Sequence, residues 1–386
     1  MRIARVWCLI LLPVVIVVYA SLRAPDCAIA EAGQSAAYMP LVISQAGSQP
    51  IGPETPAPTP TAVAPIPAPQ RGAYVGAFVD LYEASDSGYV SLERQAANYR
   101  DDSGKDLAIG LVYMDFGIPF QVSRIRRLAA LEVVPMVTWD PVGVEHLDLQ
   151  SILSGEWDGY IVRWAHDAAS IDSPMFVSFG HEMNGDWYAH SGSLNGGGET
   201  TGYGDPHKPD GPERYVDTWR RVHGILKREG VTNVSWVFSP NCESLPNEAW
   251  NRPISYYPGA AYVDWVGIDG YNWGTTQPAW GSQWLAFDEV FDSEWRGRSL
   301  STMMDQIPDK PFMIAEFASA EQGGDKAGWI ADAYSRIQHD YPRIGAVLWF
   351  NQDRETDWRI NSSESSRQAY ENAVSDPYWI DHVPVW

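Results

Sequence analysis

Short, uninterrupted apolar runs recur along the chain, and most are followed by polar or aromatic residues. The run Met175–Phe179, for example, ends at Gly180 and leads directly into His181 and Glu182. It is too short for an amphipathic helix and too continuous for a strand with one face in water, which indicates a parallel strand buried on both faces. Strands of this kind are predicted at Tyr74–Asp80, Leu107–Phe116, Val133–Trp139, Met175–His181, Val234–Ser239, Val263–Tyr271, Phe312–Phe317 and Ile344–Phe350.

Between the apolar runs, hydrophobic residues recur at helical spacing. One predicted helix begins at Pro212 and is closed by Gly230, and two more stripes run from Leu153 to Ala168 and from Trp329 to Ile337. Alternation of eight strands with helices predicts a (β/α)8 TIM barrel. A doubly wound open sheet is the alternative. The number of units and the lack of a Gly-rich phosphate loop after the first strand favour the barrel.

The N-terminal part of the chain has a different character. Residues 1–30 contain basic residues, an apolar run and a small-residue site at Ala28-Ile-Ala30, which predicts a secretory signal, with an uncleaved anchor as the alternative. Residues 31–71 are rich in Ala, Pro and Thr and predict an extended linker. The catalytic domain is then expected at 72–386. We expect a secreted or envelope-attached monomer.

Composition narrows the class of ligand. The formal net charge of −22 argues against nucleic acid and against an anionic membrane surface as partners. The 18 Trp and 19 Tyr are either core residues or surfaces that stack on the apolar faces of sugar rings.

Two glutamates follow or end predicted strands. In a barrel the carboxyl ends of the strands meet at one face, so Glu182 and Glu316 should share one opening. A pair of carboxylates is the apparatus of glycoside hydrolysis, in which one protonates the leaving oxygen and the other attacks the anomeric carbon or activates water. Desolvation should raise the pKa of Glu182, the expected acid. Tyr271 is the expected hydrogen-bond donor to Glu316.

Other chemistries fit the sequence less well. His181-Glu182 is not followed by a second histidine at helical spacing, which excludes the zinc protease motif. The segment Asp205–Asp210 lacks the ligand spacing of a calcium loop and is interpreted as a solvated turn. Cys242 has no recognisable histidine partner and is interpreted as a packing residue. No metal or cofactor is expected.

The Gly-rich segment Ser191–Gly211 is too long for a simple turn. We expect it to fold over the cleft. A flexible surface insertion is the alternative.

The motifs at four strands resemble glycoside hydrolase family 26, over roughly residues 72–375. His181-Glu-Met-Asn-Gly185 with Trp187 resembles the family's acid/base motif, and Ala315-Glu-Phe317 resembles its nucleophile motif. Asp269-Gly-Tyr271 is similar to the strand-six aspartate and tyrosine, and Trp349 to the strand-eight tryptophan under the sugar. The resemblance implies a retaining endo-β-glycanase on a (β/α)8 barrel, with Glu182 as acid/base and Glu316 as nucleophile.

The resemblance leaves the polymer open. After strand three the chain has Trp139-Asp140, where mannanases of the family tend to have Trp-His, and this is closer to members that act on mixed-linkage glucan or xylan. Mannan and glucan differ at the C2 hydroxyl, and the residues expected to read it are Trp139, Asp140, His181 and Asn241. Trp187, Tyr188, Trp273 and Trp349 are expected to line further sugar positions. The alternative function is a surface carbohydrate-binding protein without turnover, which would not need both carboxylates.

Overall fold

A closed ring of eight parallel strands forms the centre of the protein. The computed structural model describes residues 65–78, 83–85, 88–298 and 300–384. The ring runs β11-β1-β4-β5-β6-β7-β8-β10 and closes through pairing of β10 with β11. Its strands are β1 (Ala73–Phe78), β4 (Ile109–Asp115), β5 (Val134–Asp140), β6 (Met175–Phe179), β7 (Val234–Phe238), β8 (Trp265–Val266), β10 (Phe312–Ser319) and β11 (Ile344–Trp349). The predicted (β/α)8 barrel is thereby confirmed, because an open sheet would not close on itself.

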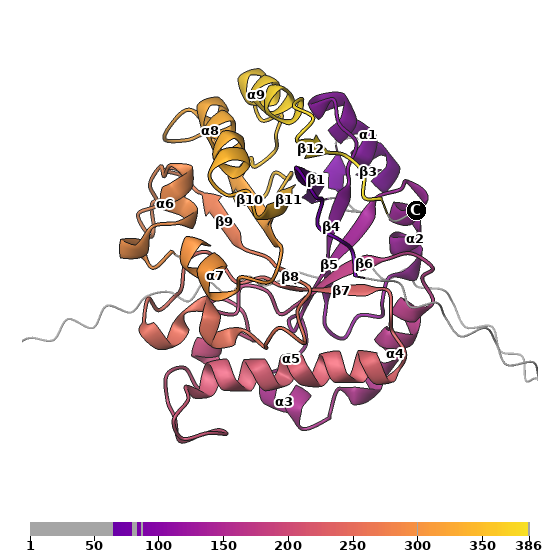
Figure 1. Ribbon diagram of the computed structural model, residues 1–386, viewed down its shortest axis with the longest axis vertical. Helices are drawn as coiled ribbons and strands as arrows, with labels where there is room; N and C mark the ends of the chain where they lie inside the picture. The colour runs from indigo at the N-terminus through magenta and orange to yellow at the C-terminus, as the bar shows by residue number, and fades with distance from the viewer. Residues whose placement is uncertain (1–64, 79–82, 86–87, 299, 385–386) are drawn as a thin grey trace, which may run out of the picture. The chain divides into compact units, whose positions relative to one another are not determined.

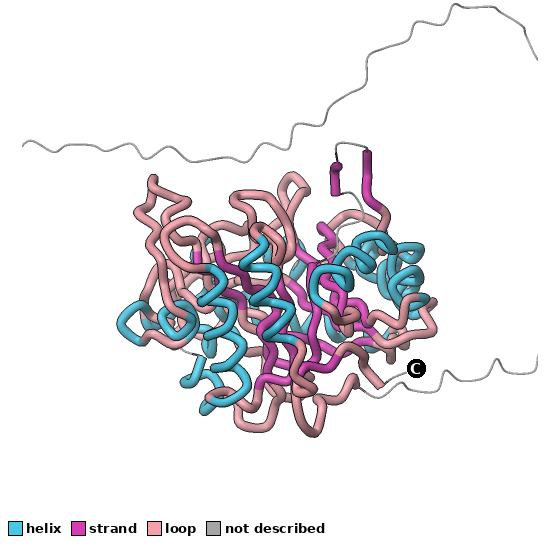
Figure 2. The backbone as a smooth tube through the Cα atoms, turned by 90° about the horizontal axis from the view of Figure 1, so that it is seen from above, coloured by secondary structure: helices cyan, strands magenta, loops and turns pink. Residues whose placement is uncertain are grey.

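Helices surround this ring on the outside (Figure 1), and the perpendicular view also shows the strands enclosed by helices (Figure 2). They are α1 (Leu92–Ser103), α2 (Val122–Ala130), α3 (Leu149–Leu153), α4 (Asp158–Ala169), α5 (Asp210–Arg228), α6 (Phe287–Phe291), α7 (Leu300–Gln306), α8 (Lys326–His339) and α9 (Glu364–Val374). Short 3-10 turns lie at η1 (Gly192–Leu194), η2 (Ala249–Asn251), η3 (Pro253–Tyr256) and η4 (Glu294–Arg296). Within the described chain, no helix is both long and apolar enough to span a bilayer.

Small strands decorate the barrel. β2 (Glu83–Ser85) and β3 (Gly88–Val90) form a separate antiparallel pair, and β12 (Trp379–Ile380) adds to β1. β9 (Asp269–Asn272) follows β8 in the chain. It also pairs with β10, and Asp269 lies opposite Glu316. The single strand predicted at Val263–Tyr271 is therefore two short strands.

Glycines account for two differences from the predicted elements. A Cβ on Gly267, between β8 and β9, would lie 2.5 Å from the Ser239 hydroxyl oxygen, so the backbone can approach there only without a side chain. Gly155 has a φ of +89°, which ends the predicted stripe from Leu153 to Ala168 and separates α3 from α4.

The start of the described chain closes the end of the barrel where the strands begin. Ile66 is 2% exposed, its backbone N–H donates to the Ser235 hydroxyl at 2.8 Å, and its carbonyl accepts from Trp265 Nε1 at 2.9 Å. Both partners lie at or next to the first residues of their strands. The folded unit therefore starts before the boundary predicted at residue 72, because an apolar side chain of the expected linker fills the barrel base. The predicted signal segment, residues 1–30, and the linker up to residue 64 lie outside the described residues.

Candidate active site

Polar side chains gather at the opposite end of the barrel, where the strands end. They come from several strands or from the residues that follow them, so the barrel brings together groups that are far apart in the sequence. They are Asp140 on β5, His181 and Glu182 after β6, Asn241 after β7, Asp269 and Tyr271 on β9, and Glu316 on β10.

Glu182 is held in an uncommon backbone conformation. Its φ is +53°, a region that side-chain-bearing residues rarely adopt. Its N–H donates to the Ser239 carbonyl at 2.8 Å and its carbonyl accepts from the Gly185 N–H at 2.9 Å, and these bonds stabilise the turn. Such strain is characteristic of functional sites, where the surrounding structure over-determines the conformation. The turn directs the Glu182 side chain to the barrel mouth.

Two donors position the Glu182 carboxylate. Trp187 Nε1 donates to Oε2 at 2.8 Å, and Asn241 Nδ2 donates to Oε1 at 2.6 Å. Asn241 is itself fixed, since its backbone N–H donates to the Asn184 side chain at 2.9 Å. The structure thus brings Trp187 and Asn241 to the predicted acid. Trp187 is 43% exposed, so one part of its ring remains open to a ligand.

Glu316 is buried beside two tyrosines. The predicted contact with Tyr271 is confirmed, since the Tyr271 hydroxyl donates to Glu316 Oε2 at 2.8 Å. The nearby Tyr113 hydroxyl also lowers the pKa of this carboxyl group. Burial raises the pKa of Glu316 to about 7, and the nearby His181 and the two hydroxyls oppose that rise. Burial raises the pKa of Tyr271 well above its usual range, so it remains a donor at neutral pH.

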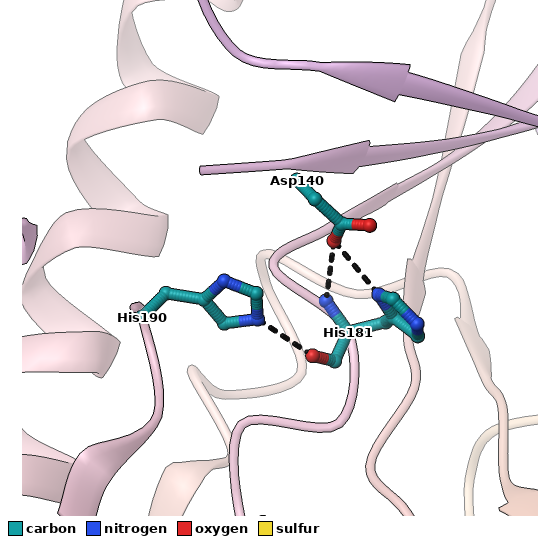
Figure 3. A group of neighbouring side chains, drawn as sticks. All are labelled: Asp140, His181 and His190. Atoms are coloured by element: carbon teal, nitrogen blue, oxygen red, sulfur yellow. Dashed lines mark hydrogen bonds and ion pairs between the residues drawn. The ribbon is translucent and has the colours of Figure 1, made fainter. Parts of the chain in front are cut away.

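His181 links Asp140 to Glu316. Its Nδ1 lies 2.7 Å from Asp140 Oδ1, and its Nε2 lies 3.7 Å from Glu316 Oε1 and 3.4 Å from the Tyr188 hydroxyl. Figure 3 shows Asp140 reaching both the ring and the backbone N–H of His181. Burial lowers the pKa of His181, but the charges of Asp140 and Glu316 more than offset it, so the pKa lies well above its usual range. A charged His181 stabilises an ionised Glu316.

Two predicted ligand-binding residues face protein groups. Asp140 is engaged by His181, as described above, and orients that ring. Asp269 is fully buried and accepts a hydrogen bond from the Ser239 hydroxyl at 3.0 Å. Burial, together with the charges of Glu316 and Glu182, raises the pKa of Asp269 well above its usual range. Both carboxyl groups are therefore buried and bound to protein groups of the site.

Two predicted tryptophans lie outside the site, and these predictions are wrong. Trp139 is fully buried, stacks on Trp164 with ring centroids 4.0 Å apart, and donates to the Tyr160 hydroxyl. Trp349 is also fully buried and donates from Nε1 to the Trp358 carbonyl at 2.8 Å. Side chains alternate along a strand, so a neighbour of an inward-facing residue points outward toward the helices.

Trp358, in the segment after β11, is buried behind two aromatic residues of the predicted site. Its ring centroid lies 5.1 Å from that of Tyr271 and 4.9 Å from that of Trp273. Trp273 is half-buried, so part of its ring is open to solvent. No periodic signal in the sequence marked Trp358, because it lies in an irregular segment.

Sequence reasoning also missed Tyr113 and Asn184. Tyr113 lies near the end of β4 and is close to Glu316. It is two residues before Asp115, so the two side chains point to the same side of the strand. Asn184 is fully buried, and its Nδ2 donates to the Asn241 and Glu243 carbonyls at 2.9 and 3.2 Å. It joins the turn after Glu182 to the segment after β7. An amide directly after the acid motif was the available signal.

The segment Ser191–Gly211 is fixed by hydrogen bonds at several points. The Gly192 N–H donates to the Met183 carbonyl at 2.9 Å, which ties its start to the Glu182 turn. Further along, the Gly202 N–H donates to Asp210 at 2.8 Å, and Arg214 donates to the Asn195 carbonyl at 2.7 Å. The segment is therefore attached both to the Glu182 turn and to α5.

Cys242 fits its interpretation as a packing residue. It is 4% exposed, and burial raises the pKa of its thiol to about 12. A protonated thiol is a poor nucleophile at neutral pH.

Among the described residues, two groups have the composition of a metal site. They are Asp140, His181 and His190, and His181, Glu182 and Asp269. Most of their ligand atoms already have partners. His190 Nε2 lies 2.7 Å from the His181 carbonyl, and His181 Nδ1 is paired with Asp140. A cation would have to displace these hydrogen bonds.

Comparisons with known proteins found similar sequences. The sequence model of "Glycosyl hydrolase family 26" matches residues 146–315. Endoglucanase H of Acetivibrio thermocellus is 40% identical over 239 residues, which cover 62% of this chain and 24% of that protein. A mannan endo-1,4-beta-mannosidase of Bacillus subtilis is 27% identical over 252 residues, 64% of this chain and 55% of that protein. The matches thus span about a quarter and about half of these two relatives.

The fold is also similar to that of a solved structure. The structure of GH26C from Muricauda sp. MAR_2010_75 superposes with a TM-score of 0.56 and 19% identity, covering 81% of this chain and 87% of that chain.

Proposed function

We propose that this chain, which belongs to glycosyl hydrolase family 26, hydrolyses internal bonds of a β-linked glycan with retention of anomeric configuration. The observation that carries the proposal is the placement of Glu182 and Glu316. Glu182 follows β6 and Glu316 lies on β10, both are at the same end of the barrel, and each is fixed by hydrogen-bond donors. Pure binding of a sugar does not require two buried carboxyl groups of this kind, whereas glycoside hydrolysis does.

In the first step, Glu182 donates its proton to the glycosidic oxygen as the bond from that oxygen to the anomeric carbon breaks. A carboxylate oxygen of Glu316 forms a bond to the anomeric carbon. In the second step, Glu182 takes a proton from water, the water oxygen bonds to the anomeric carbon, and the bond to Glu316 breaks. Tyr271 and the charged His181 favour the ionised form of Glu316 that attacks.

The favoured polymer is a β-glucan with β-1,4 linkages, and β-mannan is second. Similarity is higher to the relative named endoglucanase than to the one named mannosidase. Asp140 also supports this order, because it occupies the position where mannanases of the family tend to carry a histidine. Matches to two further mannosidases keep mannan as the second candidate.

A panel of barley-type β-glucan, glucomannan, galactomannan and xylan, read by release of reducing ends, tests this function. We expect the highest kcat/KM on β-glucan and internal cleavage from the earliest time points. Proton NMR of the first product should show the β-anomer. No release from any of the four polymers would overturn the proposal in favour of a non-catalytic carbohydrate-binding protein, and an α-anomer would overturn retention.

We also propose that residues 1–30 form a secretory signal and that the Pro-rich segment after it is a spacer to the catalytic domain. The small-residue site at Ala28-Ile-Ala30 supports this organisation. N-terminal sequencing of the protein recovered from culture medium should begin at Glu31. Protein that stays in the membrane fraction with Met1 intact would instead support an anchor.

A further inference from the structure

A series of aromatic rings leads from Glu316 to the surface along the segment after β9. The Tyr271 hydroxyl donates to Glu316, and the ring of Tyr271 lies 6.0 Å from that of Trp273. The Trp273 ring lies 5.5 Å from that of Trp280, at an interplanar angle of 77°. Trp280 is 61% exposed. Aromatic surface is thus continuous from the carboxylate to solvent.

The loop that carries Trp280 is fixed at its base. The side-chain oxygen of Asn272 accepts from the Gly274 N–H at 3.3 Å and from the Leu285 N–H at 3.0 Å, which joins the two ends of the loop. Asn272 is fully buried and donates to the Ser319 hydroxyl on β10 at 2.9 Å. The base of the loop is therefore anchored to the strand that carries Glu316.

The tip of the loop is also closed by hydrogen bonds. The Gln277 N–H donates to the Ser282 hydroxyl at 2.9 Å, and the Ser282 N–H donates to the Gln277 carbonyl at 3.1 Å. Trp280 lies between these residues. A ring presented from a loop that is ordered in advance costs little conformational entropy when a ligand binds.

The chemistry of the ligand follows from the ring and its surroundings. Single exposed hydrophobic residues are common on protein surfaces and need no ligand. Trp280 differs because its ring contacts Trp273 and so extends the series of aromatic rings that begins at Tyr271. A flat apolar ring with an N–H at its edge suits a sugar ring with apolar faces and hydroxyls at its edge. The net charge of −22 disfavours an anionic ligand.

We propose that Trp280 is a stacking platform for a sugar unit of a neutral β-glycan, distant from the bond that is cleaved. The platform lets the enzyme favour chains that extend beyond the cleaved bond, because only such a chain contacts Glu316 and Trp280 together. This inference rests on the proposed function for the class of ligand.

Binding without turnover gives the first test. The full chain carrying Glu316→Ala should be retarded in gels that contain barley-type β-glucan. Adding Trp280→Ala should weaken this affinity about tenfold, or about 1.4 kcal/mol, and Trp280→Phe should keep most of it. The matched control is Leu194→Ala, which removes another exposed side chain, 62% exposed, outside the aromatic series. Because Trp280 is exposed, its replacement should leave the melting temperature unchanged.

The active enzyme gives the second test. In Trp280→Ala, kcat/KM should fall more for the polymer than for an aryl disaccharide, with the extra loss in KM. An unchanged ratio, or equal retardation with and without Trp280, would overturn the platform while leaving the proposed hydrolysis in place. Absence of hydrolysis by the unmodified enzyme would instead overturn the proposed function. The platform would then be judged by retardation alone, and lack of retardation of the Glu316→Ala protein would overturn it too.

Discussion

The hydroxyl of Tyr271 donates a 2.8 Å hydrogen bond to Oε2 of Glu316. This bond joins β9 to β10 across their paired edges and stabilises the carboxylate in the form that attacks. Burial acts in the other direction and raises the pKa of Glu316 to about 7. The balance between these effects sets the pH range in which the nucleophile is charged.

Replacing Tyr271 with Phe should therefore move the acidic limb of the pH profile. A hydrogen bond to a charged group contributes about 1.5–3 kcal/mol, and its loss should reduce kcat/KM by about one to two powers of ten. The pKa of Glu316 should rise, so the limb in kcat/KM should shift upward from about pH 7 by roughly one to two units. The control is Tyr341→Phe, whose hydroxyl donates to Asp292 on the outer layer. A downward shift in Tyr271→Phe would contradict this account.

The two glutamates should respond differently to substrates with activated leaving groups. Such substrates need no protonation of the leaving oxygen, so Glu182→Ala should still form the glycosyl-enzyme with an aryl glycoside. Hydrolysis of that intermediate needs the Glu182 base, and a burst of the phenol followed by slow turnover is expected. Glu316→Ala should show no burst. A burst in Glu316→Ala alone would reverse the two roles.

Asp140 should act on Glu316 through His181. In Asp140→Asn the His181 ring loses the nearest of the charges that raise its pKa, so it should be neutral over more of the pH range. Glu316 then loses a cation 3.7 Å away, and its pKa should rise. We expect the acidic limb of kcat/KM to move to higher pH, with KM changed less than kcat. Asp288→Asn, which removes an acid paired with Arg336 on the outer surface, is the control and should leave the limb in place.

The buried carboxyl of Glu316 should cost the protein stability. Its pKa is about 7 in the fold against an ordinary 4.5, so the unfolded state ionises more readily. Stability is therefore lost as pH rises through this interval, by an amount on the order of 3 kcal/mol above pH 7. Glu316→Gln should raise the melting temperature at pH 8 and change it less at pH 4.5. Equal gains at the two pH values would refute this origin. The exposed Glu145→Gln is the control.

Strand positions were predictable because strands buried on both faces are apolar throughout, and such runs are visible in a sequence. The same property hides which residues face inward. Trp139 and Asp140 are adjacent, and only the alternation along β5 shows that the acid faces the barrel mouth while the tryptophan packs on Trp164. Trp349 was misplaced for the same reason.

Residues outside regular strands were harder to predict. Trp358 and Trp280 lie in irregular segments, where no period connects a residue to its spatial neighbours. The turn at Glu182 was also hidden, because a φ of +53° at a glutamate depends on the partners Ser239 and Gly185. Charged residues directly after buried strands were the strongest local signal, and they identified Glu182.

The start of the described chain and the two carboxylates lie at opposite ends of the barrel. Ile66 is buried at the end where the strands begin, and Trp379 pairs with Ala73 at that same end. A carrier protein, affinity tag or solid support joined ahead of residue 65 is thus attached on the side away from Glu182 and Glu316. Such a handle leaves the approach of a long, stiff polymer unobstructed, so immobilisation through the N-terminal side suits this scaffold without redesign of the cleft.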